Sequence, residues 1–314
     1  MTDRAVDSRF EMPDIIRCIA ICLLLTAHIC QEVESPLGGY FGFPGIYFIS
    51  LGGLAVTLFL IVSGAALELT YSGAVEYKNF FFKRLLRIYP VYYMSFFFAA
   101  AVLMVRSFHR TGTLTGAFAG ITLNDVLWDL AGFRAFTGDW GGDILMTGWY
   151  IGLIMCLYAI YPVISHYITR HPHRSIVCLL VISFLSRWLL GKYPILPTRP
   201  IDWFPLCRVF EFALGIYTIR IVSKSCLRKS FFPAQCRILI RFVNAISFPL
   251  FLVHYPLLFL ISFFLSRNLG MLPSIFNYLL ISTLVAWFIL IIDKRIPRTV
   301  VMKYLVRPIS LEKA

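Results

Sequence analysis

Apolar residues are gathered into eight long segments along the chain, separated by shorter stretches that are polar and mostly basic. A helix needs about 20 predominantly apolar residues to cross a bilayer. The segments are close to that length and occupy residues 14–32, 46–70, 84–106, 145–168, 174–191, 203–223, 247–266 and 273–293. The pattern predicts an all-α fold, a polytopic transmembrane helical bundle of about eight spans.

Two further stretches are only partly apolar. Residues 116–136 contain Asn124, Asp125 and Asp129, which suits an interfacial or re-entrant segment. Residues 230–246 are short and basic, and we expect them to form a helix on the cytoplasmic surface. If both stretches crossed the membrane the bundle would have ten spans, so the prediction covers eight to ten, with eight preferred.

The composition supports a membrane protein. Of the 314 residues, 59% are hydrophobic and 14% are charged, whereas soluble domains are about 45–50% apolar. The net charge of +13 comes from basic residues between the apolar segments rather than from one basic stripe, which excludes a nucleic-acid partner. With cytoplasmic N- and C-termini, 21 of the 29 lysines and arginines lie on the cytoplasmic side and seven on the exterior, as the positive-inside rule requires.

These features predict a multi-pass protein of the cell membrane, surrounded by lipid. We expect one integral membrane domain over residues 1–314, with no fused soluble domain and no cleaved signal peptide. The eight cysteines are scattered and have no spacing typical of a metal site. We therefore expect neither a metal nor a disulfide framework.

The first span carries three ionisable residues, Asp14, Arg17 and His28. Asp14 and Arg17 are three residues apart, and eleven residues bring His28 back to nearly the same side of a helix. Because charge in a bilayer costs roughly 2.5–3.5 kcal/mol per residue, such groups usually face a protein interior or a wet cavity. The alternative is that Asp14 and Arg17 anchor the helix at the headgroups while His28 bonds a neighbour.

The second and third spans contain the next informative residues. Ser63 and Gly64 would let another helix approach closely, and Glu68 is expected to reach the headgroups. Arg84 and Arg87 project from one helix face at the cytoplasmic end of the third span, with Lys83 beside them. Clustered arginines suit phosphate groups, because each guanidinium donates two parallel hydrogen bonds, although contact with anionic lipid is an equal alternative.

Later spans carry a smaller set of polar and aromatic residues. Trp149 begins the fourth span and is expected either at an acceptor site or as an interfacial anchor. Arg208 and Glu211, three residues apart in the sixth span, are most simply a buried ion pair. Ser247 and His254 are two helical turns apart and share a face, and a histidine inside an apolar run is a functional candidate.

Together these positions resemble the acyltransferase-3 family of integral membrane O-acyltransferases. The resemblance rests on the order and spacing of Asp14-x-x-Arg17 with Ala20 and His28, Phe59 with Ser63-Gly64, Arg84-x-x-Arg87-Ile88-x-Pro90-x-Tyr92, Trp149 with Tyr158 and Pro162, Arg208 with Phe212 and Gly215, and Ser247 with His254. Ile154 departs from the pattern, since many members have a glutamate there. The family also more often has about ten spans.

The resemblance implies acyl transfer, most simply of an acetyl group, from cytoplasmic acetyl-CoA to a hydroxyl of a cell-envelope glycan or related acceptor. Arg84, Arg87 and, more weakly, Lys83 are then assigned to the CoA phosphates. Arg17 would contact the donor or stabilise its cavity, and Asp14 would hold Arg17 in place.

Transfer to a hydroxyl needs a base near neutral pH, and imidazole, with a pKa near 6.5, suits that role. His28 is assigned as this base, or alternatively as a transient acyl carrier, and His254 is the reserve base. Because His28 lies nearer the exterior end of its span, we expect the acceptor to enter from outside. Two rivals stay open: a transporter or flippase of a lipid-linked or small anionic substrate, and a non-catalytic membrane subunit.

Overall fold

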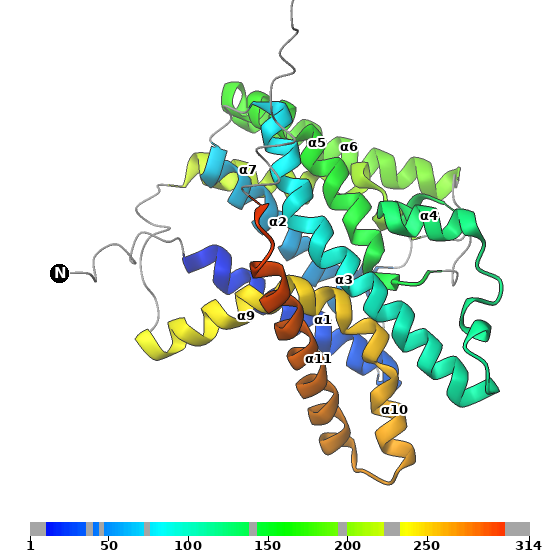
Figure 1. The fold of residues 1–314 in the computed structure, drawn as a ribbon. Coiled ribbons are helices and arrows are strands. Elements are labelled where there is room, and N and C mark those ends of the chain that lie inside the picture. The colour runs from blue at the N-terminus through cyan, green and yellow to red at the C-terminus, as the bar shows by residue number, and fades with distance from the viewer. Residues whose placement is uncertain are drawn as a thin grey trace, which may run out of the picture.

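The computed structural model describes residues 11–35, 40–43, 47–71, 76–137, 143–193, 200–222 and 233–298 (Figure 1). The first ten residues and the tail 299–314, both predicted to be cytoplasmic, lie outside this part of the chain. The α-helices of the described part are α1 Glu11–Glu32, α2 Leu51–Tyr71, α3 Tyr77–Thr111, α4 Leu123–Ala131, α5 Trp149–Arg170, α6 Pro172–Lys192, α7 Val209–Ile221, α9 Ala234–Val253, α10 Phe259–Ser266 and α11 Met271–Lys294. The predicted helical bundle is confirmed.

Short elements connect the helices. A small antiparallel hairpin, β1 Tyr40–Phe43 and β2 Tyr47–Ser50, joins α1 to α2. The 3₁₀ turns are η2 Thr115–Phe118, η3 Arg134–Phe136, η4 Met146–Gly148, η5 Ile201–Trp203, η6 Pro205–Arg208 and η7 Tyr255–Leu257. Within 116–136 the longest helix is α4, whose nine residues are too few to cross a bilayer.

Seven of the described helices are long and apolar enough to cross a membrane: α1, α2, α3, α5, α6, α9 and α11. They begin and end near the predicted spans, except in two places. The predicted span 203–223 is two 3₁₀ turns followed by α7, a helix of 13 residues. The other exception is the predicted span 247–266.

That span is not a single helix, and 230–246 is not a separate surface helix. Helix α9 runs unbroken from Ala234 to Val253, and the chain then forms η7 before α10 begins at Phe259. Pro256 explains the break, because proline lacks an N–H and its ring collides with the carbonyl four residues earlier. That carbonyl, of Leu252, accepts a hydrogen bond of 2.9 Å from the Thr147 hydroxyl. The bundle thus satisfies a backbone group that the broken helix leaves free.

Helices α2 and α7 lie in close contact, as Ser63-Gly64 predicted. A Cβ atom on Gly64 would lie 2.1 Å from the carbonyl oxygen of Phe212, and one on Gly215 would lie 1.9 Å from that of Ile61. Glycine at both positions lets the two backbones touch. This contact fixes α2, which carries Phe59 and Ser63, against the rest of the bundle.

Glu68 does not reach the headgroups, so that expectation is wrong. Its side chain is 1% exposed, accepts hydrogen bonds from Tyr161 (3.0 Å) and Ser165 (2.7 Å), and pairs with Arg220. A buried carboxylate is tolerated only with such partners. Glu68 ties α2 to α5 and α7 within the core.

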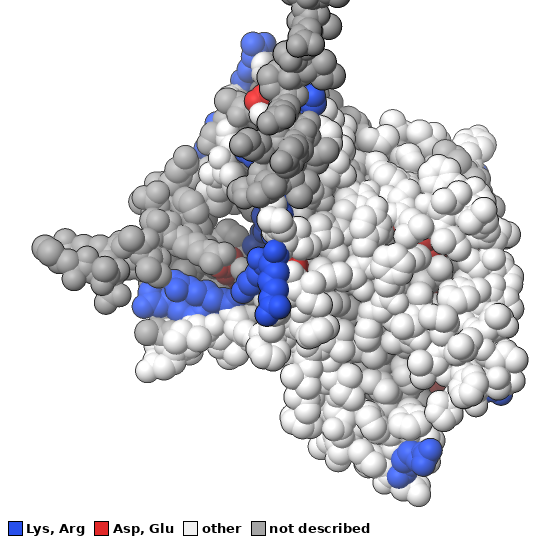
Figure 2. Space-filling model, in the orientation of Figure 1, with Lys and Arg blue, Asp and Glu red and all other residues white. Residues whose placement is uncertain are grey.

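Basic side chains are unevenly distributed over the surface. Figure 2 shows Lys and Arg gathered over α9 and the C-terminal end of α11, while the broad face over α3 and α10 is almost uncharged. These basic ends belong to the segments that the positive-inside rule assigns to the cytoplasm. The orientation itself stays a prediction.

Candidate active site

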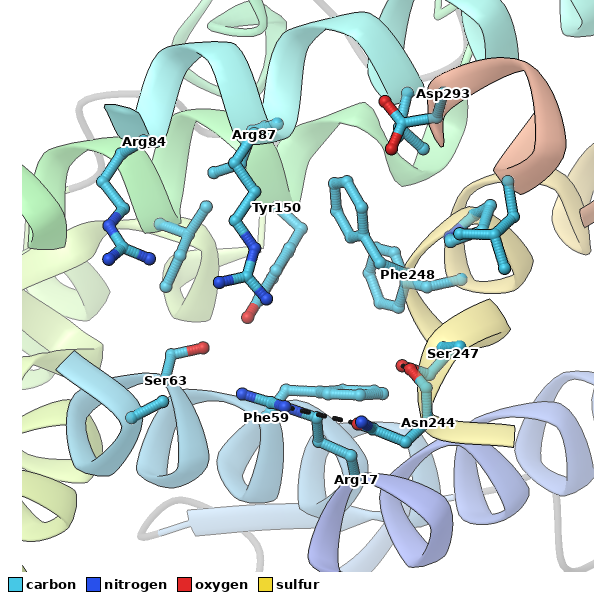
Figure 3. A pocket seen from close by; sticks show the side chains of 18 of the residues that line it. Arg17, Phe59, Ser63, Arg84, Arg87, Tyr150, Asn244, Ser247, Phe248 and Asp293 are labelled. Atoms are coloured by element: carbon cyan, nitrogen blue, oxygen red, sulfur yellow. Dashed lines mark hydrogen bonds between the residues drawn. The ribbon is translucent and has the colours of Figure 1, made fainter. Parts of the chain in front are cut away.

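A cavity of about 320 Å³ lies between α1, α2, α3, α5, α9 and α11 (Figure 3). Its lining includes Arg17, Phe59, Ser63, Arg84, Arg87, Ile88, Tyr150, Ile154, Tyr158, Arg241, Asn244, Ser247, Phe248, Phe251, Asp293 and Arg298. The structure therefore brings three of the predicted arginines and Ser247 to one site. Lys83 is exposed and is not part of the lining, so the geometry gives it no place there.

Arg84 and Arg87 extend from α3 into the cavity, and Arg17 reaches toward them from α1 on the opposite side (Figure 3). The Arg84 guanidinium donates to the Tyr71 hydroxyl at 3.0 Å and lies over the ring of Tyr158, with 5.9 Å from its central carbon to the ring centroid. Its Nε is buried and has no hydrogen-bond partner among the residues that the structure describes. Aromatic rings hold the guanidinium without neutralising it, so donor capacity is left for a ligand.

Arg17 is held from two sides. Its Nη1 donates to the amide oxygen of Asn244 at 3.3 Å and lies 3.7 Å from Asp14. The predicted Asp14–Arg17 contact is therefore present. Asp14 does not line the cavity, which fits a residue that positions Arg17 rather than one that meets a ligand.

The charge of the lining is strongly positive. Five arginines line the cavity, and the acid among its lining residues is Asp293, which is paired with Arg298. Guanidinium groups bind phosphate and carboxylate groups in a bidentate manner and stay charged even when partly buried. The arrangement suits a ligand with several negative charges.

Aromatic side chains form part of the cavity wall. The Phe251 ring contacts the rings of Tyr150 (4.9 Å between centroids) and Phe59 (5.7 Å). On its other side Phe251 contacts His254, with 6.2 Å between centroids. Neither His254 nor His28 lines the cavity. Phe251 therefore lies between the arginine-lined space and the histidines.

The two candidate histidines form a pair. Their ring centroids are 5.2 Å apart, although the residues lie on α1 and just after α9. The Nδ1 of His254 is within 3.1 and 2.8 Å of the carbonyl oxygens of Leu250 and Phe251, and carbonyls only accept, so Nδ1 carries the hydrogen. Its Nε2 is buried and, within the described part of the chain, has no hydrogen-bond partner, so it is left as a free base.

His28 has a similar tautomer. Its Nδ1 lies 2.8 Å from the amide oxygen of Gln31, which can only accept. The Tyr255 ring stands edge-on to His28, with 5.3 Å between centroids. Both imidazoles thus have Nδ1–H engaged and Nε2 available to take a proton. Helix α9 packs along α1 and ends at Val253, which places His254 and Tyr255 beside His28.

The remaining candidates lie away from this site. Arg208 and Glu211 form the predicted ion pair at 3.3 Å, and Arg187 adds a second contact to Glu211 at 3.0 Å. Trp149 stacks on Trp203 with 4.9 Å between ring centroids and 1° between planes. These five residues hold α5, α6 and α7 together, and their geometry indicates a structural role.

Several lining residues were missed by the sequence interpretation: Tyr150, Arg241, Asn244, Phe251 and Arg298. Arg241 was placed on a surface helix and Arg298 in a tail. The periodicity of basic residues at 237 and 241, one helical turn apart and just before Asn244 and Ser247, was the signal that α9 continues into the site.

Comparison with known proteins adds three findings. A family model described as "Acyltransferase domain" matches residues 11–233. The curated protein "Regulator of hypoxia-inducible factor 1" of Caenorhabditis elegans is 23% identical over 213 residues, which are 62% of this chain and 41% of that protein. The chain thus spans less than half the length of this relative. No solved structure matches the chain.

Proposed function

Because the chain belongs to the acyltransferase-3 family and is a membrane acyltransferase, we propose that it moves an acetyl group from acetyl-CoA to a hydroxyl of a cell-envelope glycan. The assignment of acetyl-CoA as donor rests on the cavity into which Arg17, Arg84 and Arg87 project together. CoA bears several phosphates, and clustered guanidiniums bind such groups. The proposed orientation opens this cavity toward the cytoplasm, where acetyl-CoA is made.

The histidine pair supplies the base. Nε2 of His28 takes the proton of the acceptor hydroxyl as its oxygen attacks the thioester carbonyl. The tetrahedral intermediate collapses, the C–S bond breaks, and the proton passes from the imidazolium to the departing thiolate. The products are the O-acetylated acceptor and free CoA.

His254 supports His28 in this proposal. Its 0% exposed ring is held through Nδ1 by the two carbonyls of α9, so its Nε2 carries no hydrogen and is an uncharged acceptor. A neutral imidazole can stabilise a transient imidazolium without placing a permanent charge in the membrane. Position 154, where many family members have glutamate, is a buried isoleucine in the cavity wall. Proton transfer therefore rests on the imidazoles.

The acceptor is proposed to enter from the exterior. His28 lies four residues before α1 ends at Glu32, and the polar groups close to it are Gln31 and Tyr255. Hydroxyl and amide groups of this kind can form hydrogen bonds with a sugar hydroxyl. The choice of a glycan as the acceptor rests on the resemblance of the motifs to those of the family.

A transporter of a small anion is the second candidate. The break between α9 and α10 favours it, because discontinuous helices at membrane depth often form transport sites. The two functions differ in their dependence on CoA. A transferase consumes acetyl-CoA, whereas a transporter does not.

The test is the thermal stability of the purified protein in detergent with and without acetyl-CoA. A ligand that binds only the folded state at 100 times its Kd adds about 2.7 kcal/mol to stability. We expect acetyl-CoA to raise the Tm of wild type and His28→Ala but not of Arg84→Ala/Arg87→Ala. The matched control is Arg170→Ala/Arg174→Ala, which removes two exposed arginines from outside the cavity.

A folded wild type whose Tm does not move at millimolar acetyl-CoA would refute the donor assignment and favour transport. If the donor binds, radiolabelled acetyl transfer to purified envelope glycan decides the acceptor. His28→Ala should then bind acetyl-CoA normally and lose at least about 100-fold in turnover.

A further inference from the structure

The donor cavity has an aromatic part of its wall besides its arginines. The rings of Phe59, Tyr150 and Phe251 line the cavity, and Phe251 contacts the other two and also His254. All three rings are buried, with exposures of 9%, 6% and 3%. A ligand bound by its phosphates to the arginines would place its apolar part against these rings.

Phe251 is the ring that contacts both regions. It lines the cavity, and its centroid lies 6.2 Å from that of His254. The thioester carbonyl must pass the edge of this ring to meet the histidine pair. Only a small acyl group on that carbonyl fits past the ring without displacing it.

The ring has little freedom to move aside. Phe59 meets it edge-on, with 81° between planes, and Tyr150 packs on it at 53°. Tyr150 is itself packed edge-on against Trp149, with 5.9 Å between ring centroids. Close-packed interiors respond to even one added methylene, so an acyl chain that extends past the thioester would collide with a fixed wall.

We propose that Phe251 sets the acyl-chain length of the donor: it stands between the cavity and the histidine pair and restricts the enzyme to short acyl groups such as acetyl. This inference rests on the proposed function, since it assumes that an acyl-CoA occupies the cavity. Phe251 is a specificity-determining residue in this proposal and takes no part in proton transfer.

The experiment measures Kd for acetyl-CoA and hexanoyl-CoA by thermal shift on the purified full-length protein. It needs no acceptor. Wild type should bind hexanoyl-CoA no more tightly than acetyl-CoA. Phe251→Ala should change the ratio of the two Kd values roughly tenfold or more in favour of hexanoyl-CoA, since pockets discriminate single methylenes by about 10-fold or more. Phe251→Leu should change it less.

The matched control is Phe248→Ala, on the same helix and in the same cavity wall (Figure 3). It removes an equal ring and should leave the ratio within twofold of wild type. An unchanged ratio in Phe251→Leu, or an equal change in Phe248→Ala, would overturn the inference even if Phe251→Ala failed to fold. Wild type that binds neither thioester would refute the donor site and this inference together, whereas binding with an unchanged ratio refutes only the inference.

Discussion

The contact between α2 and α7 makes Gly215→Ala the most informative single substitution. A Cβ atom at this position would lie 1.9 Å from the Ile61 carbonyl oxygen and 2.8 Å from the Ala65 nitrogen. Both atoms belong to the backbone of α2, so no side-chain rotation relieves the overlap. Because such contacts are essentially never below 3.0 Å, the helices must separate by at least about 1 Å.

Overpacking of this kind usually destabilises by about 1–3 kcal/mol, and a clash between two backbones belongs at the upper end of that range. We therefore expect Gly215→Ala to lower the Tm by roughly 5 °C or more. We expect activity to fall by more than the loss of folded protein explains, because α2 carries Phe59 and Ser63 into the cavity. A displacement of 1 Å near a reacting group can cost about 100-fold in rate.

The assay is a melting curve in detergent together with acetyl-CoA binding at a temperature where the variant is folded. Gly191→Ala is the matched control, since the nearest atom to its new Cβ, Ile201 Cδ1, is at an ordinary 3.7 Å. That substitution should be neutral or stabilising, because alanine favours a helix by about 1 kcal/mol over glycine. If Gly215→Ala melts within a degree of wild type and binds acetyl-CoA normally, the close packing of α2 on α7 is refuted.

Three more outcomes follow from the structure. Thr147→Val removes the donor to a carbonyl left free by the broken helix and should destabilise by about 1–3 kcal/mol; an unchanged Tm would contradict this. Glu68→Gln should lower the Tm, whereas Glu76→Gln, at an exposed position, should not; equal effects would show that Glu68 is not a core partner. The backbone N–H of Thr122 and then its hydroxyl hold the pKa of Asp125 below its usual range. The ionised Asp125 carboxylate stabilises the fold fully above about pH 4, and this stabilisation is lost as the pH falls through the lowered pKa. The fluorescence of Trp128, which lies on α4 with Asp125, should therefore change only at acid pH, and a change centred near neutral pH would exclude this carboxyl as its cause.

Short-range sequence patterns predicted contacts on one helix well. Asp14 and Arg17, and likewise Arg208 and Glu211, are three residues apart and were expected to meet, and both pairs do. The small size of Ser63 and Gly64 also predicted that another helix would approach closely, and the backbone of Phe212 lies against Gly64. Such contacts depend only on helical geometry, which the sequence alone determines.

Contacts between distant segments were not accessible in the same way. His28 and His254 were two separate candidates, and the packing of α9 along α1 brings their rings together. Glu68 was expected at the headgroups because it lies near a helix end, but Tyr161 and Arg220 enclose it. Hydropathy reports how apolar a segment is, not which neighbour covers it.

The partners of each buried charge separate structural from functional residues in this bundle. In the part of the chain that the structure describes, Arg208 faces Glu211 and Arg134 lies 2.6 Å from Asp125, so each charge is balanced by a fixed acid. Arg84 instead rests against aromatic rings and keeps a buried Nε with no hydrogen-bond partner. In the sequence Arg84 and Arg208 look alike, since each is an arginine in or beside an apolar run. A buried cation retained without an equal counter-charge is costly, and a polyanionic ligand that enters the cavity would supply that counter-charge. The proposed donor site therefore differs from the structural ion pairs in its unequal pairing of charges, which no single stretch of sequence displays.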